Sequence, residues 1–148
     1  IDVPWPEQEY AFERQMALAE RLKKPLILHC VRAYNELMQY RRRSDQSIPW
    51  IFHWFNASPE IARELMRMNC FLSFGHLLFH ETSKAFRVFP EIPVPSLFLE
   101  TDDTSYSIRE ISARAGSLRG LSPGDLIRQL HDNFKTCFGI AAENGKLD

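Results

Sequence analysis

Several features that mark specialised classes of protein are missing from this sequence. It holds only 3 cysteines among 148 residues, and their wide, unpaired spacing predicts reduced thiols in a cytoplasmic protein rather than a disulfide framework. No hydrophobic run is long enough to span a membrane and no signal peptide opens the chain, so we expect no membrane partner. The net charge of −1 argues against a protein that coats nucleic acid through bulk charge.

The sequence also lacks a methionine at its start, since the first residue is Ile1. This start predicts a fragment of a longer chain or a processed product. Hydrophobic residues make up 45% and charged residues 25% of the chain, which is an ordinary globular composition. Because no linker or low-complexity segment interrupts it, we expect residues 1–148 to form a single domain with its own core.

What the sequence does contain is a regular alternation of two kinds of segment. Short apolar stretches, which predict buried strands, occur at PLILHC, WIFHWF, CFLSFG and SLFLETD. Stretches with hydrophobic residues at helical spacing occupy residues 7–24, 33–43, 58–68, 81–88, 107–119 and 122–134. Strands that are apolar throughout and separated by helices predict a parallel sheet, in either an open doubly wound fold or a (β/α) barrel. No glycine-rich phosphate loop follows a strand, which disfavours the nucleotide-binding form of the open sheet.

Local signals mark where the predicted helices begin and end. Ser58 precedes Pro59, a combination typical of an N-cap followed by the first helical turn. Ser107 and Glu110 have the spacing of a capping box, and Gly120 predicts the end of that helix. The hydrophobic positions expected to face inward are Ala11, Phe12, Met16, Leu18, Ala19 and Leu22 in the first helix, and Leu126, Ile127, Leu130 and Phe134 in the last.

Three of the four predicted strands end in a potential metal ligand: His29, His53 and Asp102. The carboxyl ends of parallel strands share one edge of the sheet, where α/β proteins assemble their active sites, so we expect these distant residues to meet. Two imidazoles and a carboxylate suit Zn, Mn or a similar divalent ion with positions left open for water. For either histidine alone, a hydrogen-bonded structural role is the alternative.

Four further residues near the strand ends are candidates for the same site. Glu100 has the strand parity of Asp102, and because a buried carboxylate needs a partner, we expect it to orient a metal-binding histidine. Arg32, Trp54 and His76 are candidate substrate-binding residues. The alternatives are an ion pair for Arg32, a core position for Trp54 and a solvated loop for His76.

In order and spacing, these segments resemble the TatD family of metal-dependent hydrolases, many of them described as deoxyribonucleases. The resemblance covers nearly the whole chain, and its parts are Gln8, Phe12 and Gln15 before PLILH, then His53-Trp54-Phe55, LSFG, FLETD, Asn133 and Phe138. It implies a TIM-type barrel, one or two divalent metals at the strand ends and hydrolysis of phosphodiester bonds in DNA. It also implies that His29, His53 and Asp102 are metal ligands.

The chain departs from the family pattern in several places. It has no counterpart of the family's N-terminal His-x-His strand, and of the strand that supplies a bridging carboxylate only Ile1-Asp2 remains. The predicted fold is therefore a partial TIM-type barrel, the C-terminal portion, with about half of the eight strands that a closed barrel requires. Asp103-Thr104 replaces the usual Ala-Pro, and Val31 stands where an arginine is typical, with Arg32 directly after it.

Together these features predict a metal-dependent hydrolase that acts on ester bonds, a phosphodiesterase of the deoxyribonuclease kind. Its cofactors would be one or two divalent ions (Zn, Mn or Mg), with Asp102 as ligand or general base and Glu100 supporting a histidine. The expected partners are DNA as substrate and a second copy of the partial barrel. Two alternatives stay open: hydrolysis of a small phosphoester, lactone or amide, and a degenerate barrel that binds a partner without catalysis.

Overall fold

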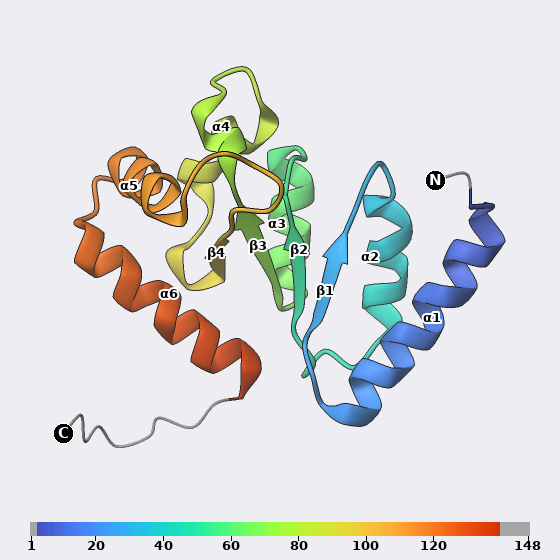
Figure 1. Cartoon of the computed structure of the whole chain (residues 1–148). Coiled ribbons are helices and arrows are strands. Elements are labelled where there is room, and N and C mark those ends of the chain that lie inside the picture. Colours follow the sequence, from blue (N-terminus) through green and yellow to red (C-terminus); the bar gives the residue numbers. More distant parts are fainter. Residues whose placement is uncertain (1–2, 140–148) are drawn as a thin grey trace.

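The computed structural model describes residues 3–139, and at its centre lies a sheet of four parallel strands (Figure 1). Their order across the sheet is their order in the chain: β1 (Leu26–His29), β2 (Trp50–His53), β3 (Cys70–Phe74) and β4 (Leu97–Leu99). The helices are α1 (Trp5–Leu22), α2 (Tyr34–Arg43), α3 (Pro59–Arg67), α4 (Lys84–Val88), α5 (Ile108–Arg119) and α6 (Pro123–Phe138). Short 3₁₀ turns are η1 (His76–Phe79), η2 (Phe89–Glu91) and η3 (Val94–Ser96). The predicted alternation of strands and helices is confirmed.

The register of the strands brings the two strand-end histidines side by side. Leu28 of β1 pairs with Phe52 of β2, and His29 pairs with His53 at the end of the same ladder. The backbone N–H of Glu100 donates to the carbonyl of Phe74 (3.0 Å), which continues the β3–β4 contact beyond the last strand residue. Because all four strands run in the same direction, the loops that follow them open at one edge of the sheet.

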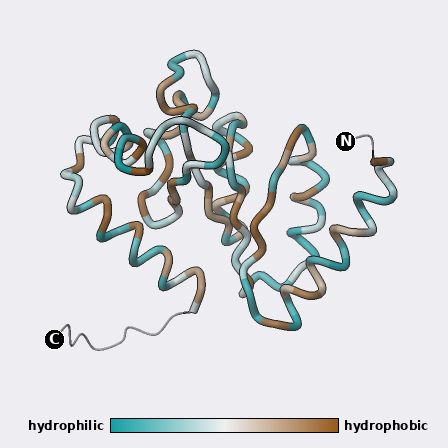
Figure 2. Tube along the Cα trace, in the orientation of Figure 1, coloured by the Kyte–Doolittle hydropathy of each residue, from teal (hydrophilic) through white to brown (hydrophobic). Residues whose placement is uncertain are grey.

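The two faces of the sheet have different surroundings. Alternate strand residues such as Trp50, Phe52 and Leu72 belong to the main core, which they share with the helices. Residues of the opposite parity form a smaller cluster that the end of α6 covers, and its members are Ile51, Phe71, Phe98, Cys137 and Phe138. Figure 2 shows β1 as a hydrophobic stretch, whereas the helices alternate between hydrophilic and hydrophobic residues.

No helix within residues 3–139 combines the length and hydropathy needed to cross a membrane.

The predicted helix signals have the expected geometry. The side chain of Ser58 accepts a hydrogen bond from the N–H of Ile61, and Ser107 and Glu110 form a complete capping box. Gly120 ends α5 in the left-handed conformation, with φ of 61°, which glycine adopts without the steric cost that a Cβ imposes. These local interactions fix the helix ends and hence the paths of the loops.

Two sequence-based expectations about the helices were wrong. The helix expected at residues 81–88 begins only at Lys84, because Ser83 caps it by accepting from the N–H of Phe86. In α1, only Ala19 of the expected stripe is buried, while Leu18 and Leu22 are 38% and 55% exposed. The reason is that α1 packs on β1 and α2 through one side, which carries Phe12 and Met16, while Leu18 and Leu22 lie outside this contact. Ile127 and Phe134 of α6 are exposed as well.

Candidate metal centre

Two histidine rings converge at the carboxyl edge of the sheet. His29 Nδ1 lies 2.8 Å from His53 Nε2. The two ring centroids are 4.9 Å apart. A neutral imidazole carries one lone pair, so this close pair of nitrogens either shares a single proton or offers both lone pairs to a cation. The arrangement confirms that the strand ends bring these two distant residues together.

Glu100 contacts His53 at the ring nitrogen that does not face His29. Its Oε1 lies 3.4 Å from His53 Nδ1, the ring nitrogen that faces away from His29. The same carboxylate accepts hydrogen bonds from the backbone N–H of Trp54 (2.5 Å) and from the hydroxyl of Ser73 (2.5 Å). A carboxylate behind the far nitrogen favours the tautomer of His53 with hydrogen on Nδ1 and a lone pair on Nε2. This is the support that a metal-binding histidine needs.

The loops around this edge leave the strands through strained backbone turns. Arg32 after β1, Trp54 after β2 and Asp102 after β4 have φ of 61°, 50° and 46°, a left-handed conformation that non-glycine residues adopt at an energetic cost. For Trp54, the hydrogen bond from its N–H to Glu100 helps to hold the turn. After β3, a Cβ added to Gly75 would lie 3.1 Å from the carbonyl oxygen of Glu100. A glycine therefore lets β3 approach Glu100 closely.

The described residues supply part of a metal site rather than a closed set of ligands. No group of three or more His, Cys, Asp or Glu side chains that could hold an ion occurs within residues 3–139. Asp102 is exposed, in the bend that follows β4. The two converging imidazole nitrogens with a carboxylate behind one of them fit a divalent ion of intermediate softness. Such an ion would keep further positions for water, substrate or other protein groups.

Aromatic rings line the pair of histidines on one side. The indole of Trp54 stacks on His29, with centroids 5.9 Å apart and planes at 17°, and the ring centroid of His76 lies 6.1 Å from that of Trp54. Trp54 Nε1 and His76 Nδ1 are both buried without a hydrogen-bond partner among the described residues. Unpaired buried polar atoms are costly, so these two ring nitrogens are the unsatisfied polar groups next to the histidine pair.

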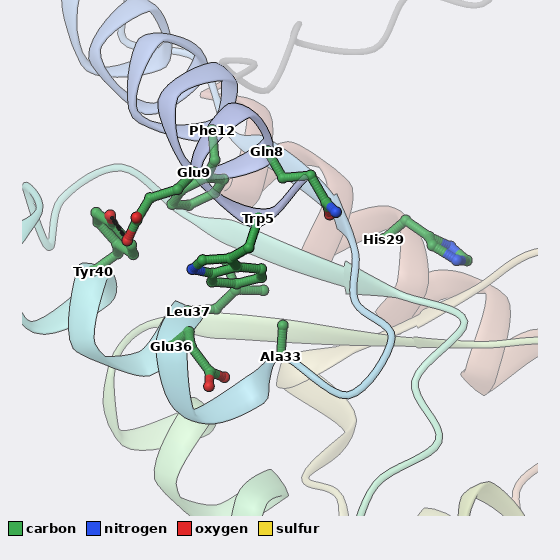
Figure 3. Close-up of a pocket in the computed structure, with 9 residues that line it drawn as sticks. All are labelled: Trp5, Gln8, Glu9, Phe12, His29, Ala33, Glu36, Leu37 and Tyr40. Carbon is green, nitrogen blue, oxygen red and sulfur yellow. Dashed lines mark hydrogen bonds between the residues drawn. The ribbon is translucent and has the colours of Figure 1, made fainter. Parts of the chain in front are cut away.

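A hollow of about 210 Å³ lies between α1 and α2, with His29 at its edge. Figure 3 shows Trp5, Gln8, Glu9 and Phe12 reaching into it from α1, opposite residues from α2. The hydroxyl of Tyr40 donates to Glu9 Oε1 (2.6 Å), and this hydrogen bond raises the pKa of Tyr40 above its ordinary value. Glu36 also lines the hollow, and its negative charge together with that of Glu9 makes this surface unfavourable for phosphate.

Arg32 does not line the hollow that reaches His29. It lines a different hollow, together with Asn35, Asn56, Ser58 and Lys84, over the ends of β1 and β2. Within residues 3–139, no salt bridge to Arg32 is formed, so the ion pair considered as its alternative is absent there. Its guanidinium is consequently available to an anion.

Ser73 is the residue at the site that sequence reasoning missed. Its hydroxyl donates to Glu100, and the residue is 3% exposed. The available signal was a single hydroxyl in the otherwise apolar segment CFLSF of β3. A buried polar side chain on a strand needs a partner, and the parity of Ser73 puts it on the same side of the sheet as Phe71, away from the main core.

Four parallel strands with their site residues at one edge define an α/β protein, and comparison with solved structures identifies the fold as part of a TIM-type barrel. The solved structure of YjjV, a TatD homologue from Escherichia coli, superposes with a TM-score of 0.83 at 24% identity, covering 92% of this chain and 58% of that one. A TatD family hydrolase from Entamoeba histolytica gives a TM-score of 0.75 over 90% of this chain. The partial-barrel prediction is confirmed at the level of the fold.

Sequence comparison identifies the family. Residues 2–139 match the model of the TatD related DNase family, so the chain belongs to the TatD family. The uncharacterized metal-dependent hydrolase YabD of Bacillus subtilis is 36% identical over 69% of this chain and 43% of its own length. The 3'-5' ssDNA/RNA exonuclease TatD of Klebsiella pneumoniae is 30% identical over 76% and 44%. The human 3'-5' RNA nuclease TATDN2 is 31% identical over 73% and 15%, so the chain spans less than half the length of these curated relatives.

Proposed function

We propose that this chain carries part of the active site of a metal-dependent phosphodiesterase that acts on DNA. The observation that carries the proposal is the convergence of His29 Nδ1 and His53 Nε2 at 2.8 Å, with Glu100 behind His53. The family is one in which several relatives are named metal-dependent hydrolases and others are named nucleases. A single-stranded nucleic acid is the substrate class that those nuclease names support.

Each residue of the site has a defined part in this proposal. A bound divalent ion supplies Lewis acidity, which lowers the pKa of water and polarises a phosphoryl oxygen. His29 and His53 hold the ion through the two converging nitrogens, and Glu100 keeps the ring of His53 in the required orientation. Asp102, at the mouth of the site, acts as a third ligand or accepts the proton from the attacking water.

Trp54 and His76 contact the substrate in the same proposal. Each has a buried ring nitrogen without a partner among the described residues. The ring of Trp54 stacks on His29, and the ring of His76 lies next to Trp54. An indole beside the scissile bond suits a nucleobase, because every base has a flat face that can stack on it. The imidazole of His76, which lies next to this indole, adds a polar contact with the substrate.

The test compares His53→Ala with His131→Ala. His131 is exposed on α6 and serves as the matched control. Metal binding is measured first, by equilibrium dialysis of the metal-free protein against Zn or Mn, since this readout does not depend on turnover. Hydrolysis of a single-stranded oligodeoxynucleotide, an oligoribonucleotide and a panel of small esters is measured next.

We expect His53→Ala to lose about 10-fold or more in metal affinity and its phosphodiesterase activity, while His131→Ala matches the unaltered protein. Wild-type metal content and activity in His53→Ala would refute the assignment. Metal-dependent cleavage of small esters with no cleavage of either oligonucleotide would support the metal site and show that its substrate is a small ester rather than a nucleic acid.

A further inference from the structure

A second polar hollow, of roughly 350 Å³, lies beside the metal centre. Its lining comes from the segments that lead from β1 to α2, from β2 to α3 and from β3 to α4, including the first turns of these helices. The polar groups that line it are Arg32, Asn35, Asn56, Ser58 and Lys84. Because the loops all open at the carboxyl edge of the sheet, this hollow faces the same side of the molecule as the histidine pair.

The hollow is lined by two positively charged side chains, Arg32 and Lys84, and by no negatively charged one. Neither cation forms a salt bridge within residues 3–139. Asn56 adds hydrogen-bond donors, because its Oδ1 already accepts from the N–H of Ala85 (2.9 Å) and its amide N–H groups therefore point elsewhere. Two cations with amide donors are the groups that bind phosphate.

The distance from the hollow to the metal centre is short. Arg32 follows His29 by three residues, and Asn56 follows His53 by three residues. Three residues of extended chain span at most about 10 Å. Successive phosphates of one strand are separated by a single nucleotide, so the phosphate next to the scissile bond falls within this reach.

We propose that this hollow is a second phosphate subsite, which binds the phosphate of a nucleotide next to the one being cleaved. The proposal rests on the proposed function and narrows it, since a small phosphoester has no second phosphate to place there. It also explains why a chain of net charge −1 can bind a polyanion, because the attraction is local rather than global.

Binding of a fluorescein-labelled single-stranded oligodeoxynucleotide, measured by anisotropy in EDTA, tests the subsite without any catalytic step. The variants are Arg32→Asn, chosen because asparagine tolerates the left-handed backbone at this position, Lys84→Gln and the double variant. Lys24→Gln is the matched control, an exposed lysine that precedes β1 at the opposite end of the strands. Circular dichroism checks that each variant is folded.

Each subsite variant should weaken binding about fivefold and reduce the slope of log K against log salt by about 0.7, and the control should change neither. Wild-type affinity and slope in the double variant would overturn the proposal, as would an equal loss in Lys24→Gln. Inorganic phosphate that binds as tightly as the oligonucleotide would also overturn it, in favour of a free-phosphate site. Failure of the proposed function shows separately, as absence of metal-dependent cleavage by the wild-type protein.

Discussion

Replacing Glu100 should damage the site in two measurable ways. The carboxylate accepts the N–H of Trp54 and the hydroxyl of Ser73, and each hydrogen bond to a charged group contributes about 1.5–3 kcal/mol. Glu100→Ala leaves both donors unpaired, so we expect it to lower the free energy of unfolding by about 3–5 kcal/mol. Against a typical stability of about 5–15 kcal/mol, such a variant can fail to fold.

Glu100→Gln is therefore the informative substitution. An amide of the same shape can still accept from Trp54 and donate to Ser73, so the loss is limited to the charge, about 1–2 kcal/mol. The contact with His53 Nδ1 at 3.4 Å also weakens, and loss of a carboxylate behind a ligating histidine typically costs about 10–100-fold in metal affinity.

Urea denaturation followed by circular dichroism measures the stability of Glu100→Gln, and competition with a chromophoric chelator measures its affinity for Zn or Mn. Glu110→Gln is the control, since this glutamate belongs to the capping box of α5 and not to the site. A Glu100→Gln variant that binds metal like the wild type would show that Glu100 does not orient His53. Equal losses of metal affinity in the two variants would assign the effect to general destabilisation.

Three further predictions concern the stability of the scaffold. Arg41 is fully buried and donates to carbonyl oxygens of two later segments, at Asp45 and Met68. Arg41→Met should therefore cost about 3–5 kcal/mol in urea unfolding, whereas the exposed Arg42→Met should change it by less than about 0.5 kcal/mol. Gly75→Ala places a Cβ 3.1 Å from the carbonyl of Glu100 and should cost about 1–3 kcal/mol; a thermal melt unchanged from wild type would contradict this. Burial raises the pKa of Cys70 from 9.0 and of Tyr34 from 10.0, both to about 12. The folded state therefore holds these protons more tightly than the unfolded state, and the free energy of unfolding should fall as pH rises from 9 toward 12. Comparing the urea midpoints at pH 8 and pH 11 would test this.

The histidine pair could be predicted because it depends on properties that a sequence records directly. Apolar stretches predict strands, intervening helices predict that the strands are parallel, and parallel strands expose their carboxyl ends at one edge. His29 and His53 occupy the same position relative to their strands, so the register pairs them. No long-range information is needed beyond the alternation itself.

Exposure of the helix faces could not be predicted in the same way. Periodicity gives the side of a helix that is apolar, but the partner that covers this side is set by the tertiary arrangement. Leu18 and Leu22 satisfy the helical period and are nevertheless exposed, because α1 contacts the sheet at β1. The same limit applies to Ile27, on the open side of β1, which is 60% exposed.

The acids of the LFLETDD segment show where local pattern stops being informative. Glu100 and Asp102 have the same strand parity, yet β4 ends at Leu99. Glu100 is still fixed by the hydrogen bond of its N–H to Phe74, whereas Asp102 lies in a left-handed bend. Parity therefore predicts the direction of Glu100 and fails for Asp102, because the alternation of side chains holds only while the backbone remains extended. The strand positions Glu100, which supports His53. The turn positions Asp102, which we assign to the mouth of the site, and no periodic pattern in the sequence predicts such a turn.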